Sequence, residues 1–423
     1  MNKQNNDTKQ LPKDWKIVKL NEAGKIISGG TPSTAIQEYW NGNINWISPA
    51  DLTGYKKKTI IKGAKSITDS GLKNSSARLM PAGSVLFSSR APIGYVAIAA
   101  DELSTNQGFK SIIPNENVQS EFLYYFLKAS KQSAEKVASG TTFKEISLSK
   151  FSELDFPLPP KPTQQAIVSK IEELFSELDK GIENLHTAQQ QLKTYRQSVL
   201  KWAFEGKLTN ENVKEGELPT GWKLVQIKDV AETYGGYAFK SGEFKTQGKY
   251  QVLRMGNVRP GILRYDESPV FLNKVDENVL SRSLLQINDI IITQTGTRKK
   301  RDYGFTVLIP KTNLLLNQRI AAIRFKEKYL PKFFLYFSWT DLFKDQFFEN
   351  ETGNVGQGNV GMKAVTETLI PFCSIDEQHN IVQAIESRLS VADKMEESIT
   401  QSLQQAEALR QSILKKAFEG KLI

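Results

Sequence analysis

The sequence predicts an α/β protein in which two mixed α/β domains are joined by a long antiparallel two-helix coiled coil, with an internal pseudo-twofold duplication. Three observations support this fold class. A unit occurs twice in the chain, each unit contains short β-rich runs separated by turns, and each ends in a long stretch of helical periodicity. The 423 residues, of which 39% are hydrophobic, supply enough apolar material for more than one core.

The duplication is visible as matching segments that occur in the same order. LPKDWK at 11–16 returns as LPTGWK at 218–223, and RQSVLKWAFEGKL at 196–208 returns as RQSILKKAFEGKL at 410–422. An offset of about 207–214 residues indicates a domain duplication, because the repeats of a solenoid are only about 20–50 residues long.

The first part of each unit has the pattern of a mixed α/β domain. Runs such as TIIKGAKSI, GSVLFSS and GYVAIAA in the first unit, and NDIIITQ and GFTVLIP in the second, alternate with turn clusters. One helical segment per unit, at 120–139 and 331–350, adds an apolar face. The expected division is an N-terminal tail at 1–14, a first domain at 15–160, a first spacer helix at 161–210, a second domain at 211–370 and a second spacer helix at 371–423.

The second part of each unit is expected to be one long amphipathic helix. A proline-rich break at 157–162 precedes the first helix, Thr163 is a candidate N-cap, and apolar residues then recur at steps of three and four. Gly206 and Gly420 stand where a glycine C-cap is expected. Helices of about 40 residues extend about 60 Å, so each needs another helix to cover its apolar seam. Antiparallel pairing would place one domain at either end of a common bar.

The composition and motifs argue against several kinds of site. The single cysteine, Cys373, excludes an intramolecular disulfide, and with only His186 and His379 a zinc site of Cys and His is not expected. No apolar run approaches the roughly 18 residues that span a bilayer, and no secretory signal is evident, so we expect a cytoplasmic protein. A G-x-G-x-x-G match at 356–361 lacks the strand and helix of a nucleotide site, and no P-loop or catalytic triad stands out. No catalytic residue, metal site or cofactor is therefore assigned to this chain.

The net charge of +10 is concentrated in the two predicted domains. Residues 1–160 carry a net charge of +6 and residues 211–370 carry +5, whereas 161–210 carry +1 and 371–423 carry −2. A basic soluble surface would explain this, but two basic blocks held apart also suit two sites on one DNA duplex. The candidate DNA-binding residues are loop cations, namely Lys56, Lys57, Lys58 and Arg90 in the first domain and Arg254, Arg259, Arg298, Lys299, Lys300 and Arg301 in the second.

From about Leu11 to Leu422 the chain resembles the specificity (S) subunit of a type I restriction-modification system. The resemblance rests on the LPxxW opening of each unit, the segments PLPPKPTQQAIV and PFCSIDEQHNIV before the helices, and the AFEGKL helix ends. The family pattern at the helix start is usually P-x-P-x-x-x-E-Q-x-x-I. The second unit keeps Glu377-Gln378, but the first has Thr163-Gln164, so one local contact is expected to differ.

The resemblance implies that each domain is a target recognition domain for one half of a bipartite double-stranded DNA target, and that the helices set the gap. The chain would not be an enzyme by itself. Two modification (methyltransferase) subunits would bring S-adenosylmethionine, and restriction subunits would bring ATP and magnesium. The loop residues of the two domains differ, which predicts an asymmetric target. A self-sufficient nuclease or methyltransferase, or a scaffold that binds no DNA, are the alternatives.

Three aromatic residues near the helix ends, Trp202, Phe204 and Phe418, are candidate binding residues for the partner subunits. Packing at the base of each domain is the alternative role for these side chains.

Overall fold

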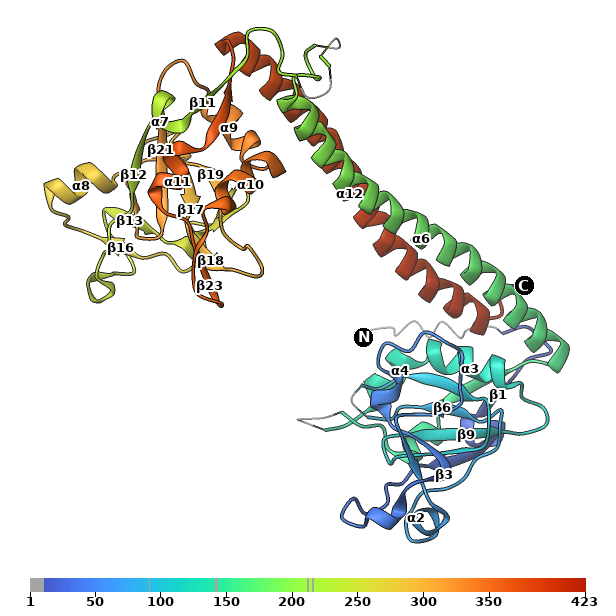
Figure 1. The fold of residues 1–423 in the computed structure, drawn as a ribbon. Helices are drawn as coiled ribbons and strands as arrows, with labels where there is room; N and C mark the ends of the chain where they lie inside the picture. The colour runs from blue at the N-terminus through green and yellow to red at the C-terminus, as the bar shows by residue number, and fades with distance from the viewer. Residues whose placement is uncertain (1–10, 91, 141–143, 211–212, 215–216) are drawn as a thin grey trace, which may run out of the picture. The chain divides into compact units, whose positions relative to one another are not determined.

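The computed structural model of the chain describes residues 11–90, 92–140, 144–210, 213–214 and 217–423. The chain divides into two compact units, Met1–His186 with Thr400–Ile423, and Thr187–Ile399. Each unit holds one α/β domain and a part of each of two long helices, α6 (Lys161–Phe204) and α12 (Ile375–Phe418) (Figure 1). The predicted fold class is confirmed.

The first domain is built on a five-stranded sheet of order β2-β9-β6-β7-β4, in which only the β4–β7 pair is parallel. A three-stranded sheet has the order β5-β3-β8, and β1 pairs with β10. The elements are β1 (Lys16–Lys19), α1 (Leu20–Ala23), β2 (Gly24–Ser28), η1 (Gln37–Tyr39), β3 (Trp40–Ile47), η2 (Pro49–Leu52), β4 (Thr59–Ile60), β5 (Lys65–Ile67), α2 (Asp69–Lys73), β6 (Val85–Phe87), β7 (Val96–Ala99), β8 (Leu103–Thr105), β9 (Lys110–Pro114), α3 (Ser120–Ala129), α4 (Lys131–Val137), α5 (Leu148–Ser152) and β10 (Asp155–Leu158).

The second domain repeats this plan with a four-stranded sheet of order β12-β21-β17-β19 and three-stranded sheets β16-β13-β20 and β18-β23-β22. Strands β11 and β24 pair as β1 and β10 do. The elements are β11 (Lys223–Gln226), α7 (Ile227–Val230), β12 (Ala231–Gly235), η3 (Ser241–Glu243), β13 (Tyr250–Leu253), η4 (Met255–Asn257), β14 (Val258–Arg259), β15 (Ile262–Leu263), β16 (Phe271–Leu272), α8 (Glu277–Ser283), β17 (Ile290–Thr293), β18 (Thr295–Thr297), β19 (Thr306–Leu308), β20 (Leu314–Leu316), β21 (Ile320–Phe325), α9 (Pro331–Phe337), α10 (Asp341–Glu349), β22 (Thr352–Gly353), β23 (Gln357–Asn359), α11 (Met362–Glu367) and β24 (Leu369–Phe372).

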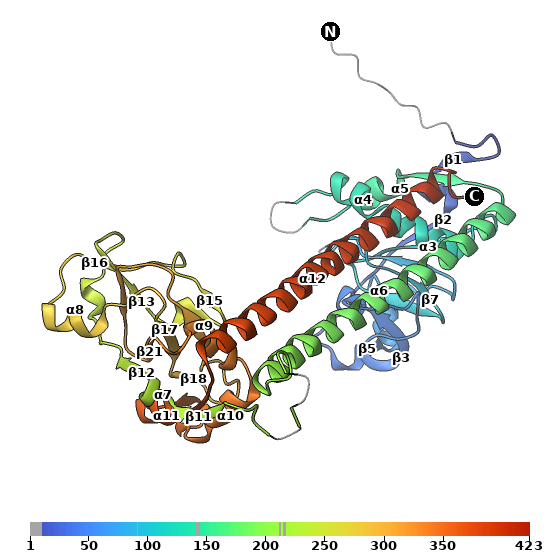
Figure 2. The ribbon, with the colours of Figure 1, turned by 90° about the horizontal axis from the view of Figure 1, so that it is seen from above.

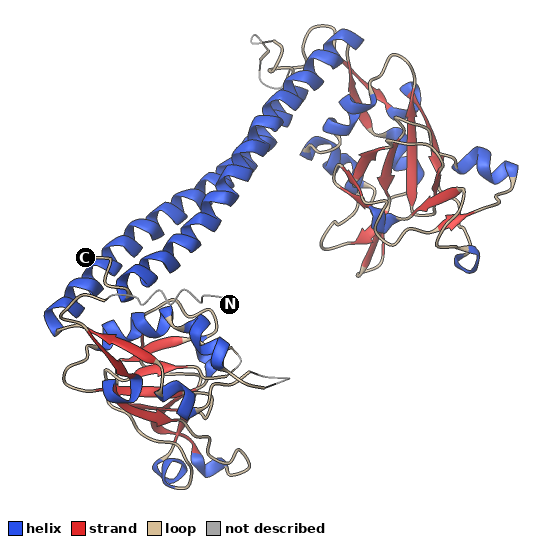
Figure 3. Ribbon diagram, turned by 180° about the vertical axis from the view of Figure 1, so that it is seen from behind, coloured by secondary structure: helices blue, strands red, loops and turns tan. Residues whose placement is uncertain are grey.

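Continuous apolar runs form the central strands of both domains. Strands β6 and β17 are buried along their whole length, which explains why their sequences are uninterrupted apolar runs without polar alternation. Figure 3 shows the strands forming the body of each domain, with short helices at its periphery.

The prediction of one helix in each of the segments 120–139 and 331–350 was wrong, because each segment forms two helices. The break between α3 and α4 lies at Ser130, whose hydroxyl donates to the Phe126 carbonyl (2.8 Å). The break before α10 lies at Thr340, whose hydroxyl accepts from the Phe343 amide (3.3 Å) as an N-cap. These hydroxyl groups satisfy backbone groups locally, which lets the chain change direction while the apolar pattern continues.

The start of α6 also differs from its prediction. The helix begins at Lys161, so Thr163 lies inside its first turn and is not the N-cap. Pro162 is accommodated because the first helical residues need no intrahelical N–H bond.

A buried glutamine fixes the start of each long helix, and the two glutamines are pseudo-equivalent. The Gln164 amide accepts from the Gln119 N–H (2.9 Å) and donates to the carbonyls of Asn117 (2.8 Å) and Pro159 (2.9 Å). The Gln378 amide accepts from the Leu330 N–H (2.7 Å) and donates to the carbonyls of Lys328 (3.1 Å) and Cys373 (3.0 Å). Both side chains are fully buried, so each amide ties a helix start to a loop of its own domain.

The residues before the two buried glutamines, Thr163 and Glu377, differ between the units, and so do their contacts, as expected. Thr209 donates from its hydroxyl to the Glu377 carboxylate (2.5 Å). At the corresponding places of the first unit stand Ile423 and Thr163. The hydroxyl donor and the carboxylate acceptor of the second unit are thus both replaced in the first unit.

The predicted glycine C-caps are confirmed at both helix ends. Gly206 and Gly420 adopt φ angles of 75° and 68°, where glycine is strongly favoured. A Cβ atom at Gly206 would lie 2.0 Å from Cγ of Pro219, and one at Gly420 would lie 2.4 Å from Cδ of Pro12. The proline of each LPxxW motif therefore packs against the glycine of an AFEGKL motif.

Each domain core contains the start of one long helix and the end of the other. Ile167 and Ile171 of α6 share a core with Ile413 and Ala417 of α12 in the first unit. In the second unit the roles are exchanged, with Val199 and Ala203 of α6 packed in the core that holds Ile381 and Ile385 of α12. Figures 1 and 2 both show the two helices side by side. The predicted antiparallel pairing is confirmed.

Pseudo-equivalent ion pairs join the two helices. Arg196 of α6 binds Asp393 (2.6 Å) and Glu396 (2.8 Å) of α12, and Arg410 of α12 binds Asp179 of α6. The Arg410 guanidinium also lies 4.7 Å from the ring centre of Phe175. The same arginine–aspartate pair is thus formed once in each unit.

The remaining expectations concern Cys373 and membrane helices. Cys373 is buried directly after strand β24, and burial raises the pKa of its thiol to about 12. The thiol is therefore protonated at neutral pH. Within the part of the chain that the structure describes, no helix is both long and apolar enough to cross a bilayer.

We expect Gln164→Leu and Gln378→Leu each to reduce the free energy of unfolding by about 1–3 kcal/mol, because the substitutions leave buried carbonyl and amide groups unsatisfied. Chemical denaturation followed by circular dichroism measures this loss. The matched controls are Gln165→Leu and Gln383→Leu on exposed faces of the same helices, which should change the stability by less than about 0.5 kcal/mol. Equal effects in both pairs would contradict the anchoring role.

Candidate nucleic-acid interface

The basic run 298–301 forms an exposed turn between β18 and β19, and part of it is bound within the domain. The Arg298 Nε atom lies 3.1 Å from a Glu351 carboxylate oxygen, and the Arg301 guanidinium lies 4.8 Å from the ring centre of Phe348. Lys299 and Lys300 are exposed. The two arginines therefore hold the turn in place, while the two lysines present their charge to solvent.

A buried network supports the base of this turn. Tyr303 is almost fully buried, and its hydroxyl donates to the Glu351 carboxylate that also binds Arg298. Burial, followed by this hydrogen bond, raises the pKa of Tyr303, so the phenol remains a donor. The turn is therefore anchored by a charged network and not by flexible surface contacts alone.

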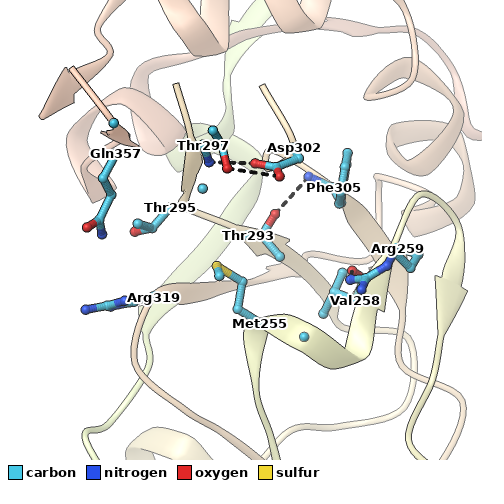
Figure 4. A pocket seen from close by; sticks show the side chains of 13 residues that line it. Met255, Val258, Arg259, Thr293, Thr295, Thr297, Asp302, Phe305, Arg319 and Gln357 are labelled. Atoms are coloured by element: carbon cyan, nitrogen blue, oxygen red, sulfur yellow. Dashed lines mark hydrogen bonds between the residues drawn. The ribbon is translucent and has the colours of Figure 1, made fainter. Parts of the chain in front are cut away.

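Beside this turn the second domain contains a hollow of about 650 Å³ (Figure 4). Its wall is fixed by Asp302, which accepts from the Thr297 amide (2.6 Å) and hydroxyl (3.2 Å), and by Thr293, which accepts from the Phe305 amide (3.0 Å). The lining comes from η4, β14, the ends of β17 to β19, the start of β21 and the β22–β23 hairpin. It comprises Met255, Gly256, Val258, Arg259, Thr293, Thr295, Gly296, Thr297, Asp302, Phe305, Arg319, Gly356 and Gln357.

Sequence reasoning missed Arg319 and Gln357, which line this hollow from the β20–β21 connection and from the hairpin. Arg319 is exposed and has a φ angle of 69°, which non-glycine residues rarely adopt. An isolated arginine carries no signal in a sequence. The adjacent pair Asn317-Gln318 does carry a signal, because it matches Asn106-Gln107 of the first unit, and it could have directed attention to this loop.

The arginines Arg254 and Arg259 both bind backbone carbonyls. Arg254 donates to the Ser268 carbonyl (2.7 Å), and Arg259 donates to the Val258 carbonyl (2.8 Å). Of the two, only Arg259 lines the hollow. The structure thus brings Arg259 and Arg319 together in one hollow, beside the turn 298–301.

In the first domain the candidates occupy two different places. Lys56 and Lys57 are exposed, whereas Lys58 binds Glu172 of α6 (2.5 Å). In the second domain Lys332 binds the pseudo-equivalent Glu386 (2.8 Å), so this kind of contact holds a domain to its helix in both units. Arg90 is exposed three residues after the end of β6 and forms an isolated antiparallel bridge with Glu145.

The three aromatic candidates for partner binding differ in exposure. Trp202 is 45% exposed on α6. Phe204 is buried, with its ring centre 5.1 Å from that of Phe333. Phe418 is partly buried, with its ring centre 5.1 Å from that of Phe122. The placement of the two phenylalanines is that of the alternative role, packing at the base of each domain, whereas Trp202 is partly exposed and its role as a partner-binding residue stays a prediction.

The glycine-rich segment 356–361 belongs to a β-hairpin. Strand β23 pairs with β18 and β22, both antiparallel. A Cβ atom at Gly358 would lie 2.3 Å from the Tyr303 hydroxyl, which explains this glycine by close packing. No group of three or more potential metal ligands occurs among the described residues, and His379 is exposed.

Comparison with known proteins identifies the family. A model of the type I restriction modification DNA specificity domain matches residues 12–187 and 219–405. The specificity subunit of the type I restriction enzyme MjaIX from Methanocaldococcus jannaschii is 35% identical over 304 residues, which cover 70% of this chain and 69% of the relative. The EcoKI specificity subunit from Escherichia coli K12 is 24% identical over 429 residues, covering 98% and 90%.

Solved structures share the fold. The HsdS subunit from Thermoanaerobacter tengcongensis aligns with a TM-score of 0.62 at 18% identity, covering 97% of this chain and 98% of that one. A chain from a study of complex assembly and conformational transition of the type I R-M system gives a TM-score of 0.72 at 18% identity, covering 97% and 99%. Because the family model matches each unit separately and together most of the chain, the protein belongs to the type I restriction modification DNA specificity family.

Proposed function

We propose that this specificity subunit recognises an asymmetric, bipartite double-stranded DNA target, with one half-site read by each domain. It does no chemistry itself and positions partner subunits on the DNA. The observation that carries the proposal is that the two domains share a backbone framework while the side chains on that framework differ.

The shared framework is defined by pairs of equivalent hydrogen bonds. In the first domain the backbone N–H of Asn106 donates to the Ile47 carbonyl (2.9 Å). In the second domain the backbone N–H of Asn317 donates to the Leu253 carbonyl (3.2 Å). At the same framework the first domain exposes Arg90, and the second exposes the turn 298–301. A common scaffold with different exposed groups favours two different half-sites, because base edges are read by side chains and not by the fold.

The long helices are proposed to set the gap between the half-sites. Each helix is fixed at its start by a buried glutamine and at its end by a glycine that packs on a proline. A helix of 44 residues that keeps these contacts would have a constant length of about 66 Å. The unspecified gap would follow from that constant length.

The partner subunits are proposed to be two copies of one modification subunit, joined by restriction subunits. Near the ends of the helices, Gln197 and Lys201 of α6 are exposed, and the identical Gln411 and Lys415 of α12 are exposed at the equivalent places. Packing explains why buried positions of a repeat remain alike, but it does not explain identical exposed residues. Two equal surfaces suit two equal partners. S-adenosylmethionine, ATP and magnesium would be bound by those partners.

The central test is to coexpress the chain with its modification subunit and to map the methylated adenines in DNA. We expect two half-sites of different sequence at a fixed separation, because the exposed residues of the two domains differ. A palindromic target would contradict the proposal that the two half-sites differ. Methylation without sequence preference would contradict the proposal that this chain recognises a DNA sequence.

A double substitution, Lys299→Gln with Lys300→Gln, should weaken DNA binding by the complex without changing the recognised sequence. Lysines at an exposed turn contact phosphates, so the slope of log affinity against log salt should fall by about 1–2. Lys328→Gln, beside the start of α12, is the matched control and should leave the slope unchanged. A changed base preference in the double variant would show that the turn reads bases instead.

Gln197→Ala combined with Lys201→Glu should weaken one partner site at least about 10-fold and leave one modification subunit per chain. The same changes at Gln411 and Lys415 should remove the other copy. Native mass spectrometry measures the stoichiometry. Lys193→Glu is the control, because its equivalent in the other helix is Glu407 and the position is therefore not part of the duplicated surface. Two copies retained on the double variant would refute this surface.

A further inference from the structure

One backbone hydrogen bond marks the same place in both domains. In the first domain the backbone N–H of Ser89 donates to the Gly108 carbonyl (2.7 Å). In the second domain the backbone N–H of Gln294 donates to the Arg319 carbonyl (3.0 Å). The residue after the donor is Arg90 in the first domain and Thr295 in the second. Each domain therefore has one arginine beside this hydrogen bond, contributed by the donor segment in the first and by the acceptor segment in the second.

Neighbouring hydrogen bonds confirm that these places correspond. The amides of Ile146 and Val360 donate to the carbonyls of Ser89 (2.9 Å) and Gln294 (2.8 Å), respectively. The donors Ser89 and Gln294 thus occupy the same position in two equivalent three-segment arrangements. The two domains therefore share these hydrogen bonds but differ in the segment that carries the arginine, and in the backbone conformation of the acceptor residue.

The backbone at Arg319 would suit glycine better than arginine. Its φ angle of 69° is disfavoured for residues with a Cβ atom. The first domain has Gly108 at this position, but Gly108 does not adopt a positive φ, so the left-handed conformation here is a feature of the second domain. Residues held in such conformations concentrate at functional sites, where the side chain is needed. The backbone conformation therefore does not favour arginine at this position, and the reason for arginine is to be sought in its side chain.

The guanidinium of Arg319 also differs from those that stabilise the domain. Arg324 binds Asp289 (2.7 Å), and Arg298 binds Glu351 (3.1 Å). Among the described residues, by contrast, no side-chain partner is found for Arg319, which is exposed at the hollow. Its five donors are available to a ligand.

The neighbours of Arg319 suit a base edge. Figure 4 shows Arg319 and Gln357 at one side of the hollow, contributed by separate elements, with Met255 near the centre. Arginine donates two parallel hydrogen bonds to guanine, the glutamine amide pairs with adenine, and apolar groups contact the thymine methyl group. A hollow with these groups offers base contacts, whereas the lysines at the tip of the 298–301 turn offer charge alone.

We propose that Arg319, with Gln357 beside it, determines the base preference at one position of the half-site bound by the second domain, and that Arg90 does the same in the first domain. The preferred contact is guanine. This inference rests on the proposed function and specifies where in each domain a base is read. Because the arginines come from opposite sides of one hydrogen bond, the two guanidinium groups meet the DNA at different places.

The test uses the complex with modification subunits and a randomised DNA library, in which both half-sites are read by methylation mapping. In Arg319→Gly the backbone conformation is favourable and the sister domain already has glycine, so the fold is retained. In Arg319→Lys the charge is retained but the planar fork is lost. Both variants should lower the preference at one base pair of the second half-site by about 5- to 150-fold and leave the first half-site unchanged.

The reciprocal variant, Arg90→Thr, introduces the residue that the second domain has at this position. It should relax one position of the first half-site only. The matched control is Arg282→Gln, an exposed arginine of α8 that does not line the hollow and should leave both half-sites unchanged.

Unchanged base preference in Arg319→Gly and Arg319→Lys, alongside a wild-type complex that selects two half-sites, would overturn this inference and leave the proposed function intact. An equal loss of affinity for all sequences would also overturn it, since that is the signature of a phosphate contact. A wild-type complex without any half-site preference would instead refute the proposed function.

Discussion

The structure depends on one constraint, which is that each domain closes its core around the start of one long helix and the end of the other. Ile167 and Ile413 lie in one core, and Val199 and Ile381 lie in the other. Burial of an aliphatic side chain of this size contributes about 1.5–3 kcal/mol, so a helix that left its core would expose several such contributions at once. The antiparallel pairing is therefore a condition for folding both domains, and the ion pairs of Arg196 and Arg410 add register to it.

Features with a local physical signal could be predicted from the sequence. The helices, their antiparallel pairing and the glycine C-caps follow from periodicity, chain order and the conformational freedom of Gly206 and Gly420. The breaks at Ser130 and Thr340 could not be predicted, because the apolar pattern continues across them and only the hydroxyl contacts reveal them. The recurrence of the LPxxW and AFEGKL motifs could not be explained from the sequence. The structure explains it, because Pro219 of one motif packs on Gly206 of the other.

The candidate site could be predicted in part. The charge run 298–301 was found because clustered cations are visible in a sequence, but two of its four side chains are engaged with Glu351 and Phe348. Arg319 could not be predicted, because the features that distinguish it are its positive φ angle and its hydrogen bond to Gln294 on another segment. Counting charges therefore overstates the cations available to DNA on a turn of this kind, and understates the importance of isolated ones.

The hydrogen bond shared by Ser89–Gly108 and Gln294–Arg319 has a consequence for how such proteins diverge. The hydrogen bond is present whether the arginine stands on the donor side or the acceptor side, although the acceptor residue has a positive φ in the second domain only. Moving the cation across would require room for it, because the positions without arginine, Thr295 and Gly108, are buried. A domain that shifts its arginine must therefore also change the side chains around the new position, such as Asn359, which binds Thr295, while the backbone hydrogen bonds of the framework can stay in place.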